Sequence, residues 1–167
     1  TSLVALVVAF LRNGRPASFG FGALYVTFPF GAFIHIREAW SDGALILLWI
    51  MILVWTTDIA AFLAGRGFGG PRIAPQKSPN KTWTGALGAF VCTVIAGAAI
   101  ARLSGGSIIY FCIAAGALSI VAQGGDILES WFKRRFGVKD ASGVIPGHGG
   151  VLDRLDSLMA VVSFVVI

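Results

Sequence analysis

The segment that decides how this chain is organised lies at residues 130–156 and reads SWFKRRFGVKDASGVIPGHGGVLDRLD. It joins two strongly apolar runs, and it holds five of the thirteen Lys and Arg residues and three of the eight Asp and Glu residues. Asp126 and Glu129 come just before it, so that five of the eight acids fall within 31 residues. So many charged residues between two helices that are apolar enough to cross a membrane are rare and energetically unfavourable. Their presence indicates a site for phosphate or metal chemistry.

The composition of the whole chain is typical of a membrane protein. Of its 167 residues, 56% are hydrophobic and 13% are charged, whereas a soluble domain has about 25% charged residues. A membrane-spanning helix needs about 20 mostly apolar residues. Apolar runs of this kind predict spans at Thr1–Leu11, Phe19–Ile36, Ala44–Leu63, Trp83–Leu103, Ile108–Leu128 and Val151–Ile167. We therefore expect an all-α fold, a polytopic transmembrane helical bundle, and the apolar ends indicate a piece of a longer protein.

The Lys and Arg residues are unevenly distributed between the loops. When alternate loops are grouped, eleven of the thirteen fall on one side of the predicted membrane and two on the other. The positive-inside rule makes the eleven-charge side, which includes loops 64–82 and 129–150, cytoplasmic. The net charge of +5 lies in short loops between apolar runs, so it indicates topology signals and contacts with anionic head groups or phosphates. We expect no nucleic-acid partner.

Three acids from three predicted spans lie at a similar depth. Asp58, Asp126 and Asp153 are each near the cytoplasmic end of a span, where an acid is unfavourable unless it meets a cation, a base or water. Asp126 shares a helix face with Glu129, and Asp153 shares one with Asp156, because residues three apart are neighbours on a helix. Two such helix ends facing each other would bring together oxygen ligands that suit Mg²⁺. The sequence leaves open the alternative of buried ion pairs with Arg134, Arg135 and Arg154.

A glycine-rich stretch, Pro146-Gly147-His148-Gly149-Gly150, precedes the last predicted span. Glycine lets the backbone approach a ligand closely, and the free N–H groups of a helix N-terminus favour anions. His148 can donate a hydrogen bond to a phosphate or transfer a proton. A tight turn into the helix explains the glycines equally well when they are considered alone.

The residues before the fourth predicted span, Ser78-Pro79-Asn80-Lys81-Thr82-Trp83, combine helix-capping side chains with a cation. Ser78 or Thr82 can cap the helix. Lys81 would lie at the helix start, where a cation is unfavourable unless an anion is near; a positive-inside anchor explains it equally well. Arg66, in a glycine-rich loop on the same side, is a further candidate contact for phosphate. The span itself is rich in small residues that suit close helix packing, namely Gly85, Gly88, Ala89, Gly97 and Ala98.

The charged segment resembles the signature of the phosphatidate cytidylyltransferases, also called CDP-diacylglycerol synthases. The residues that carry the resemblance are Ser130, Lys133, Arg134, Lys139, Asp140, Ser142, Ile145, Pro146, His148, Gly149, Gly150, Asp153, Arg154 and Asp156. The stretches at residues 57–66 and 78–83 are also similar to this family, so the likeness runs from about Trp55 to Asp156. We accordingly divide the chain into N-terminal transmembrane helices at residues 1–54 and a catalytic transmembrane domain at residues 55–167, with cytoplasmic loops 64–82 and 129–150.

The resemblance implies a membrane enzyme of phospholipid biosynthesis that converts CTP and phosphatidate into CDP-diacylglycerol and pyrophosphate. It also implies a homodimer that is embedded among membrane lipids. The activity is expected to depend on one or two Mg²⁺ ions, and a monovalent cation is a further candidate cofactor. We expect an integral protein of the bacterial inner membrane whose active site faces the cytoplasm. The predicted metal ligands are Asp126 and Asp153. The predicted catalytic residues are Asp126, Asp153, Lys133, Arg134, Lys139, His148, Arg154 and Asp156. The predicted substrate-binding residues are Arg66, Ser78, Lys81, Thr82, Gly149 and Gly150.

Two positions depart from the family pattern, and two other functions fit parts of the sequence. Thr84 stands where the family usually carries Glu, and Asn80 stands where Lys is also common. A CTP-dependent polyprenol or phytol kinase would need a general base for its hydroxyl substrate, and the long signature favours the cytidylyltransferase over it. An ion or proton transporter would use Asp58, Asp126 and Asp153 as a relay, but these acids cluster at one face of the predicted membrane.

Overall fold

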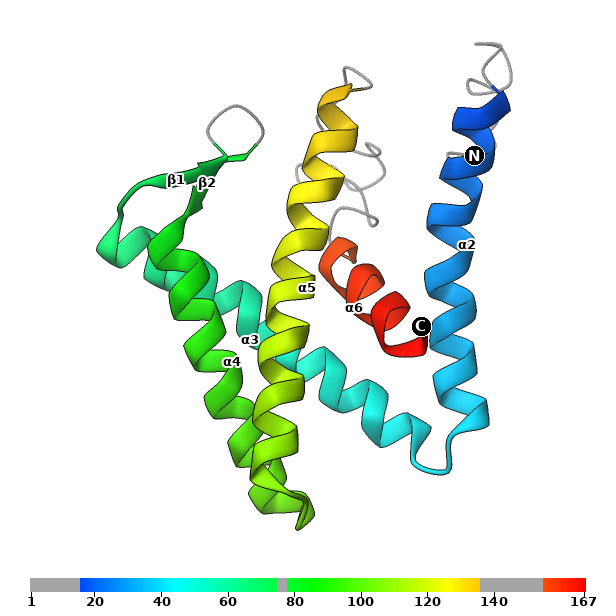
Figure 1. The fold of residues 1–167 in the computed structure, drawn as a ribbon, viewed down its shortest axis with the longest axis vertical. Coiled ribbons are helices and arrows are strands. Elements are labelled where there is room, and N and C mark those ends of the chain that lie inside the picture. Colours follow the sequence, from blue (N-terminus) through cyan, green and yellow to red (C-terminus); the bar gives the residue numbers. More distant parts are fainter. Residues whose placement is uncertain (1–15, 75–77, 136–154) are drawn as a thin grey trace, which may run out of the picture.

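The structure is a computed structural model that describes residues 16–74, 78–135 and 155–167, and it is built mainly of helices (Figure 1). The described helices are α2 (Pro16–Ala39), α3 (Gly43–Phe68), α4 (Trp83–Ser104), α5 (Ile108–Arg135) and α6 (Asp156–Val166). A small sheet of two strands, β1 (Arg72–Ala74) and β2 (Ser78–Thr82), lies between α3 and α4 in sequence. The predicted helical fold is confirmed for this part of the chain, whereas the predicted span Thr1–Leu11 lies outside the described residues.

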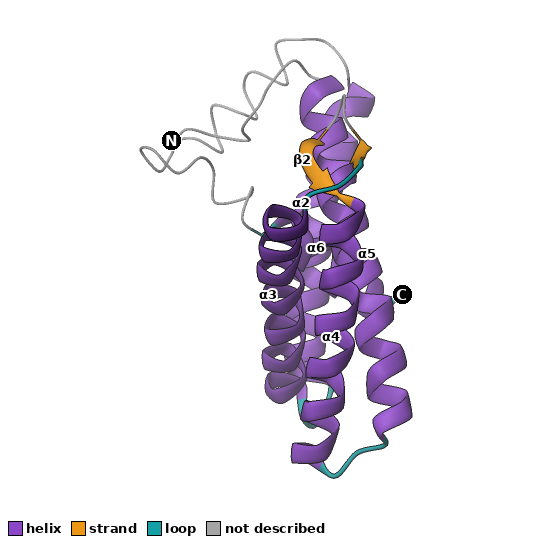
Figure 2. Cartoon of the chain, turned by 90° about the vertical axis from the view of Figure 1, so that its left-hand side faces the viewer, coloured by secondary structure: helices purple, strands orange, loops and turns teal. Residues whose placement is uncertain are grey.

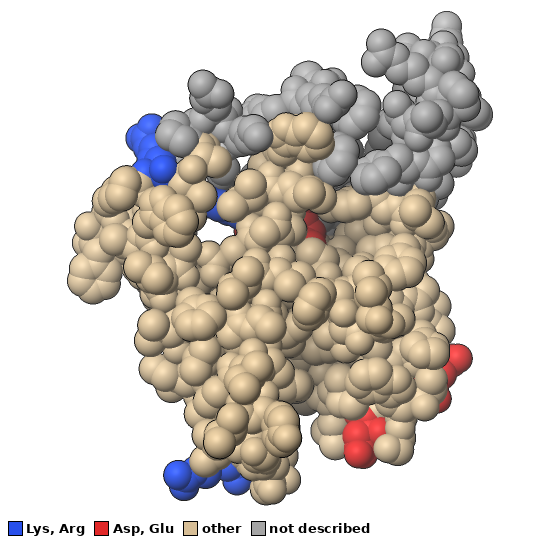
Figure 3. Space-filling model, viewed as in Figure 1, with Lys and Arg blue, Asp and Glu red and all other residues tan. Residues whose placement is uncertain are grey.

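Three of the described helices are long and apolar enough to cross a membrane, namely Gly43–Phe68, Trp83–Ser104 and Ile108–Trp131. They correspond to the third, fourth and fifth predicted spans and confirm the polytopic membrane class. Helix α2 covers the second predicted span, with Pro29 inside it. Helix α6 has 11 residues, which makes it about 16 Å long at 1.5 Å per residue, and the first residues of the sixth predicted span lie outside the described part. Figure 3 shows charged atoms toward the two ends of the molecule and a broad band without them on the face in view.

The helices form a bundle in which neighbours in sequence pack side by side. Helix α3 packs along α4, α4 along α5 and α5 along α6, and α6 also contacts α2. In Figure 1, α6 lies between α5 and α2, and the turned view in Figure 2 shows the sheet at one end of the bundle. Buried apolar side chains such as Ile36, Leu53 and Val161 form the core. Outward-facing side chains are apolar too, as for Phe62 and Ile95, each 62% exposed, because lipid solvates such surface.

Helix α4 approaches its two neighbours at backbone distance because glycines line the contacts. A Cβ atom at Gly97 would lie 2.6 Å from the Cβ of Ala115 and 2.9 Å from the carbonyl oxygen of Phe111, both on α5. A Cβ atom at Gly85 would lie 2.8 Å from the carbonyl oxygen of Ala61 on α3. The small residues of this span therefore serve close packing, as the sequence predicted.

A pair of buried hydroxyl groups also joins α3 to α4. The Oγ1 atoms of Thr57 and Thr93 lie 2.8 Å apart, and the two residues are 1% and 0% exposed. Each hydroxyl is also within hydrogen-bonding distance of the carbonyl oxygen four residues earlier in its own helix, at 2.9 Å for Thr57 and 2.8 Å for Thr93. Hydrogen bonds of this kind hold membrane helices together where hydrophobic burial gives little preference for protein over lipid.

Helix and strands occupy parts of residues 64–82, which the sequence predicted as a loop between two spans. Helix α3 continues to Phe68 and ends at Gly69, which has a φ of 64° and donates its N–H to the carbonyl oxygen of Gly65 over 3.1 Å. The chain then forms an antiparallel hairpin in which Arg72 pairs with Thr82 and Ala74 with Ser78. Gly65 and Gly67 lie within the helix, which ends instead at Gly69, a glycine with positive φ that is followed two residues later by Pro71. Pairing in the hairpin satisfies backbone groups at the end of the bundle.

Replacing Gly97 tests whether α4 and α5 depend on backbone contact. We expect Gly97→Ala to lower the free energy of unfolding by about 1–3 kcal/mol, because the added methyl group forces the two helices apart. Gly124→Ala in α5 is the matched control, since nothing lies within 4 Å of a Cβ at that position. The control should be neutral or slightly stabilising because alanine favours helix. Denaturant titration of both variants in detergent measures the difference, and equal stability would contradict the packing argument.

Candidate active site

Carboxyl groups from three helices converge inside the half of the bundle that is nearer the hairpin. Asp58 lies on α3, Asp126 on α5 and Asp156 at the first position of α6. All three surround the hydroxyl of Ser157, whose Oγ lies 2.9 Å from Asp126 Oδ1, 3.3 Å from Asp156 Oδ1 and 3.4 Å from Asp58 Oδ2. The prediction that Asp58 and Asp126 lie at one depth is therefore confirmed. Asp153, the third acid of that prediction, lies outside the described residues.

The hairpin contributes a lysine to this acid cluster, which we define as Asp58, Asp126, Glu129 and Asp156. The ammonium of Lys81, on β2, donates to Asp126 Oδ2 over 2.7 Å. Both side chains are largely shielded from solvent, at 26% and 23% exposed. The sequence predicted that a lysine beside the start of α4 is stable when an anion is near, and Asp126 is that anion. A charge-assisted bond in such surroundings is stronger than one in water.

Two threonines that follow Lys81 fix the backbone at the start of α4. Thr82 caps α4, because its Oγ1 accepts a hydrogen bond from the N–H of Gly85 over 3.1 Å. Thr84 donates to the carbonyl oxygen of Gly69, and its Oγ1 lies 3.0 Å from that of Thr82. The residue that replaces the family's usual Glu thus ties the end of α3 to the start of α4. Of the two predicted caps, the structure selects Thr82.

The acid cluster contains more negative than positive charge among the described side chains. Glu129 lies one turn after Asp126 on α5, is 5% exposed, and interacts electrostatically with Asp156. Among the described side chains, the four carboxyl groups of the acid cluster are therefore accompanied by one ammonium group, that of Lys81. Because neighbouring carboxylates disfavour one another's ionised form, such a cluster is stable when it shares protons or holds further cations.

The donor set of the acid cluster fits a hard divalent cation that is shared with a phosphate ligand. Mg²⁺ is bound through one or two carboxylates together with waters and substrate phosphates. Asp126 and its neighbours offer carboxylate and hydroxyl oxygens, and the Lys81 ammonium already occupies a cation position against Asp126. Within residues 16–74, 78–135 and 155–167, no group of three or more His, Cys, Asp or Glu side chains is arranged to hold a metal ion by itself. The arrangement fits an open site and not a closed protein cage.

Most of the basic residues predicted for the site are not placed by the structure. Arg66, in the last turn of α3, is exposed and lies with its guanidinium carbon 5.9 Å from the ring centre of Phe62. Ser78 belongs to β2, and Lys133 and Arg134 belong to the last turn of α5, but their side chains are outside the described set. The predicted site residues outside the described chain are Lys139, His148, Gly149, Gly150, Asp153 and Arg154.

Sequence reasoning missed Ser157 and the pairing of Lys81 with Asp126. Ser157 is 4% exposed, and a hydroxyl directly after the last signature acid, within an apolar run, was the available signal. The lysine pairing joins residues 45 positions apart, and nothing local in the sequence specifies such a partner.

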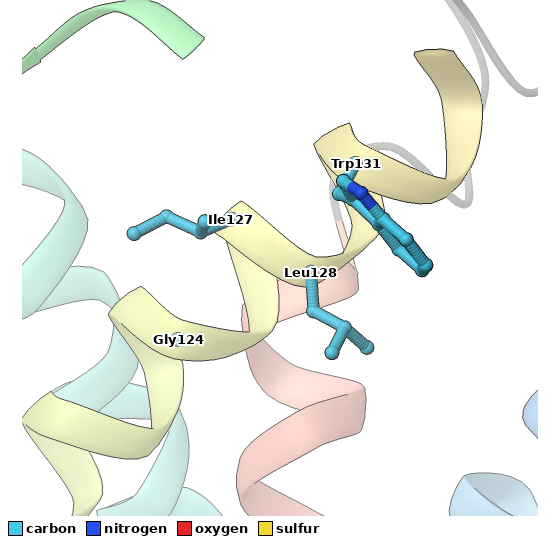
Figure 4. Close-up of a pocket in the computed structure, with 4 residues that line it drawn as sticks. All are labelled: Gly124, Ile127, Leu128 and Trp131. Carbon is cyan, nitrogen blue, oxygen red and sulfur yellow. The ribbon is translucent and has the colours of Figure 1, made fainter. Parts of the chain in front are cut away.

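A shallow depression elsewhere on α5 is distinct from the acid cluster. It measures about 300 Å³ and is lined by Gly124, Ile127, Leu128 and Trp131 (Figure 4). At about 100° per residue, Gly124, Leu128 and Trp131 lie on the side of the helix opposite Asp126, and Ile127 lies between the two sides. Its apolar lining suits contact with lipid, whereas Asp126 lies on the other face of α5.

The fold and the site together define a helical membrane protein with an acid and lysine cluster where α3 and α5 meet the start of α6. A family model described as the cytidylyltransferase family matches residues 2–167, and the chain belongs to this family. It is 43% identical over 160 residues to the phosphatidate cytidylyltransferase of Brucella suis biovar 1 (strain 1330), which covers 93% of the chain and 57% of that relative. The Haemophilus influenzae enzyme of the same name is 41% identical over 136 residues, 78% of the chain and 47% of the relative. The phosphatidate cytidylyltransferase of Rickettsia prowazekii (strain Madrid E) is 35% identical over 146 residues, which cover 83% of the chain and 64% of that relative. The chain thus spans about half the length of the curated relatives it matches.

A double-mutant cycle tests the pairing of Lys81 with Asp126. We expect Lys81→Met to lower the free energy of unfolding by about 1–3 kcal/mol, because it leaves a carboxylate without its ammonium among other carboxylates. The double variant Lys81→Met/Asp126→Asn should lose less than the sum of the two single variants, with a coupling energy of about 0.5–3 kcal/mol. Denaturant titration in detergent provides the four values.

Arg102→Met is the control for that cycle, because Arg102 is an exposed cation in the last turn of α4, at the other end of the helix that Lys81 precedes. Its loss should change stability less than the loss of Lys81. Strict additivity of the Lys81 and Asp126 substitutions would contradict the contact.

Proposed function

We propose that the full-length protein is a phosphatidate cytidylyltransferase, which transfers the cytidylyl group of CTP to phosphatidate. The observation that carries this proposal is the contact of Lys81 with Asp126 beside Asp58 and Asp156, since it unites three separate stretches that resemble the family. The names of the relatives support the same reaction. The alternative products, a phosphorylated alcohol or a transported ion, are outcomes that the test below separates.

The reaction needs positioning and charge neutralisation more than a base. A phosphate oxygen of phosphatidate attacks the α-phosphorus of CTP, a new P–O bond forms, and the bond to the β-phosphate breaks. The bonding electrons and the negative charge leave with pyrophosphate. Because the nucleophile is already an anion, no proton has to be removed from it. The two substrates are both anions and repel each other. Cationic groups must therefore neutralise their charge and hold the attacking oxygen in line with the bond that breaks.

The basic side chains of the chain would neutralise the phosphates. Lys81 stands beside the cluster and can turn its ammonium from Asp126 to a phosphate oxygen. The residues proposed to act with it are Lys133, Arg134, Lys139 and Arg154. An Arg guanidinium grips two phosphate oxygens at once, whereas a Lys ammonium acts as a point charge. His148 and the backbone of Gly149 and Gly150 would hold the departing pyrophosphate, and Arg66, Ser78 and Thr82 would flank the nucleotide.

Asp126 and Asp153 would hold one or two Mg²⁺ ions, with Asp58 and Asp156 supporting them and a monovalent cation as a further partner of the cluster. A divalent ion bound there supplies positive charge against the phosphates of the nucleotide and the lipid. The oxygen-only donor set around Ser157 supports this assignment.

The position of the cluster suits a reaction between a lipid and a soluble nucleotide. It lies in the halves of α3 and α5 that are nearer the hairpin, and both helices are able to cross a membrane, so a lipid head group and an aqueous ligand would meet on this side. The concentration of Lys and Arg on the same side supports a cytoplasmic site in the bacterial inner membrane. A homodimer is part of the proposal on the strength of the family resemblance.

Substitution of the two proposed metal ligands tests the function. In the full-length protein reconstituted with phosphatidate, we expect Asp126→Asn and Asp153→Asn each to reduce formation of CDP-diacylglycerol from labelled CTP by about a hundredfold or more. Asp42→Asn is the control, because Asp42 lies exposed in the turn before α3 and makes no side-chain cap there. Near-normal turnover in either variant would remove the role of that residue. Phosphorylated polyprenol in place of a CDP-lipid would refute the proposed function.

A further inference from the structure

Ser157 occupies the centre of the acid cluster. It is the second residue of α6 and is 4% exposed. Its Oγ lies 2.9 Å from Asp126 Oδ1 on α5, 3.3 Å from Asp156 Oδ1 on its own helix, and 3.4 and 3.5 Å from the two carboxylate oxygens of Asp58 on α3. One hydroxyl therefore touches carboxyl groups from three helices.

A hydroxyl carries one proton, so it donates one hydrogen bond at a time. The shortest contact identifies Asp126 Oδ1 as the acceptor. The opposite oxygen of the same carboxylate, Oδ2, faces Lys81 at 2.7 Å. Ser157 thus binds one oxygen of the Asp126 carboxylate and Lys81 binds the other. The hydrogen bond from Ser157 determines that Oδ2 is the oxygen that faces a cation.

We propose that Ser157 is a positioning residue for Asp126, whose hydroxyl holds Oδ1 so that Oδ2 faces the cation position that the Lys81 ammonium fills in this structure. This inference rests on the proposed function, in which Asp126 binds a divalent ion. Partners that orient a metal-binding carboxylate raise its affinity for the ion, and their loss weakens binding by about 10–100-fold.

The packing of α6 on α5 does not require this hydroxyl. A Cβ atom at Gly125 would overlap the Cβ of Ala160, so the two helices meet at backbone distance one turn along from Ser157. Helix α6 also buries Met159, Val161 and Val162. Replacing Ser157 by alanine keeps its Cβ and removes the oxygen alone, so a loss of cation binding can be separated from a loss of folding.

The test is binding of Mn²⁺ to the full-length protein in detergent without nucleotide, followed by electron paramagnetic resonance. We expect Ser157→Ala to weaken Mn²⁺ binding by about 10–100-fold, with a melting temperature no more than about 4 °C below that of the unchanged protein. Ser157→Thr, which keeps a hydroxyl, should bind more tightly than Ser157→Ala. Ser163→Ala is the matched control, because Ser163 lies on the same helix and donates to the carbonyl oxygen of Met159 over 2.7 Å.

Unchanged Mn²⁺ affinity in Ser157→Ala would overturn the inference, as would an equal loss in Ser163→Ala or absence of Mn²⁺ binding in the unchanged protein. If Ser157→Ala does not fold, Ser157→Cys replaces it, since a thiol of similar size is a weak donor and the same loss is expected. Formation of CDP-diacylglycerol is measured in parallel. A protein that binds Mn²⁺ but makes no CDP-lipid would refute the proposed function and leave the serine comparison standing.

Discussion

The contact between the Lys81 ammonium and the Asp126 carboxylate is the interaction on which the site depends. It joins the hairpin to α5 across 45 positions of sequence, and through Ser157 it reaches α6 and α3. A carboxylate at the end of a membrane helix is unfavourable without a cation or water. The lysine removes that penalty for Asp126, and it also explains why a cation is tolerated beside the N-terminus of α4.

This interaction in turn depends on how closely the helices approach. A Cβ at Gly85 would lie 2.8 Å from the carbonyl oxygen of Ala61, so the start of α4, with Lys81 just before it, is pressed against α3. On the other side, Gly125 leaves room for Ala160 of α6. The acids of three helices share one hydroxyl because these backbones are in contact. Small residues inside the bundle therefore determine electrostatics at its end.

The helices could be predicted from the sequence because apolar length is a strong and local signal. The common depth of Asp58 and Asp126 followed from counting spans, and the capping role of Thr82 followed from its position. The hairpin could not be predicted, since residues 71–82 contain Pro71, Pro75 and Pro79 and show no alternation of apolar and polar side chains. The partner of Lys81 could not be predicted either, because the packing of distant helices selects one acid among several at the same depth.

An acid-rich site appears at first to be wrong for two polyanionic substrates, and the geometry indicates how the proposed reaction resolves this conflict. The described cluster places four carboxyl groups against one lysine, so it attracts cations and repels phosphate. Phosphates can then approach Asp126 only together with positive charge, either a bound ion or the basic side chains of the neighbouring segment. Lys81 already makes the contact that such a charge would make. In the proposed reaction, a nucleotide that arrives with its counter-ion would replace that contact without leaving the carboxylate bare.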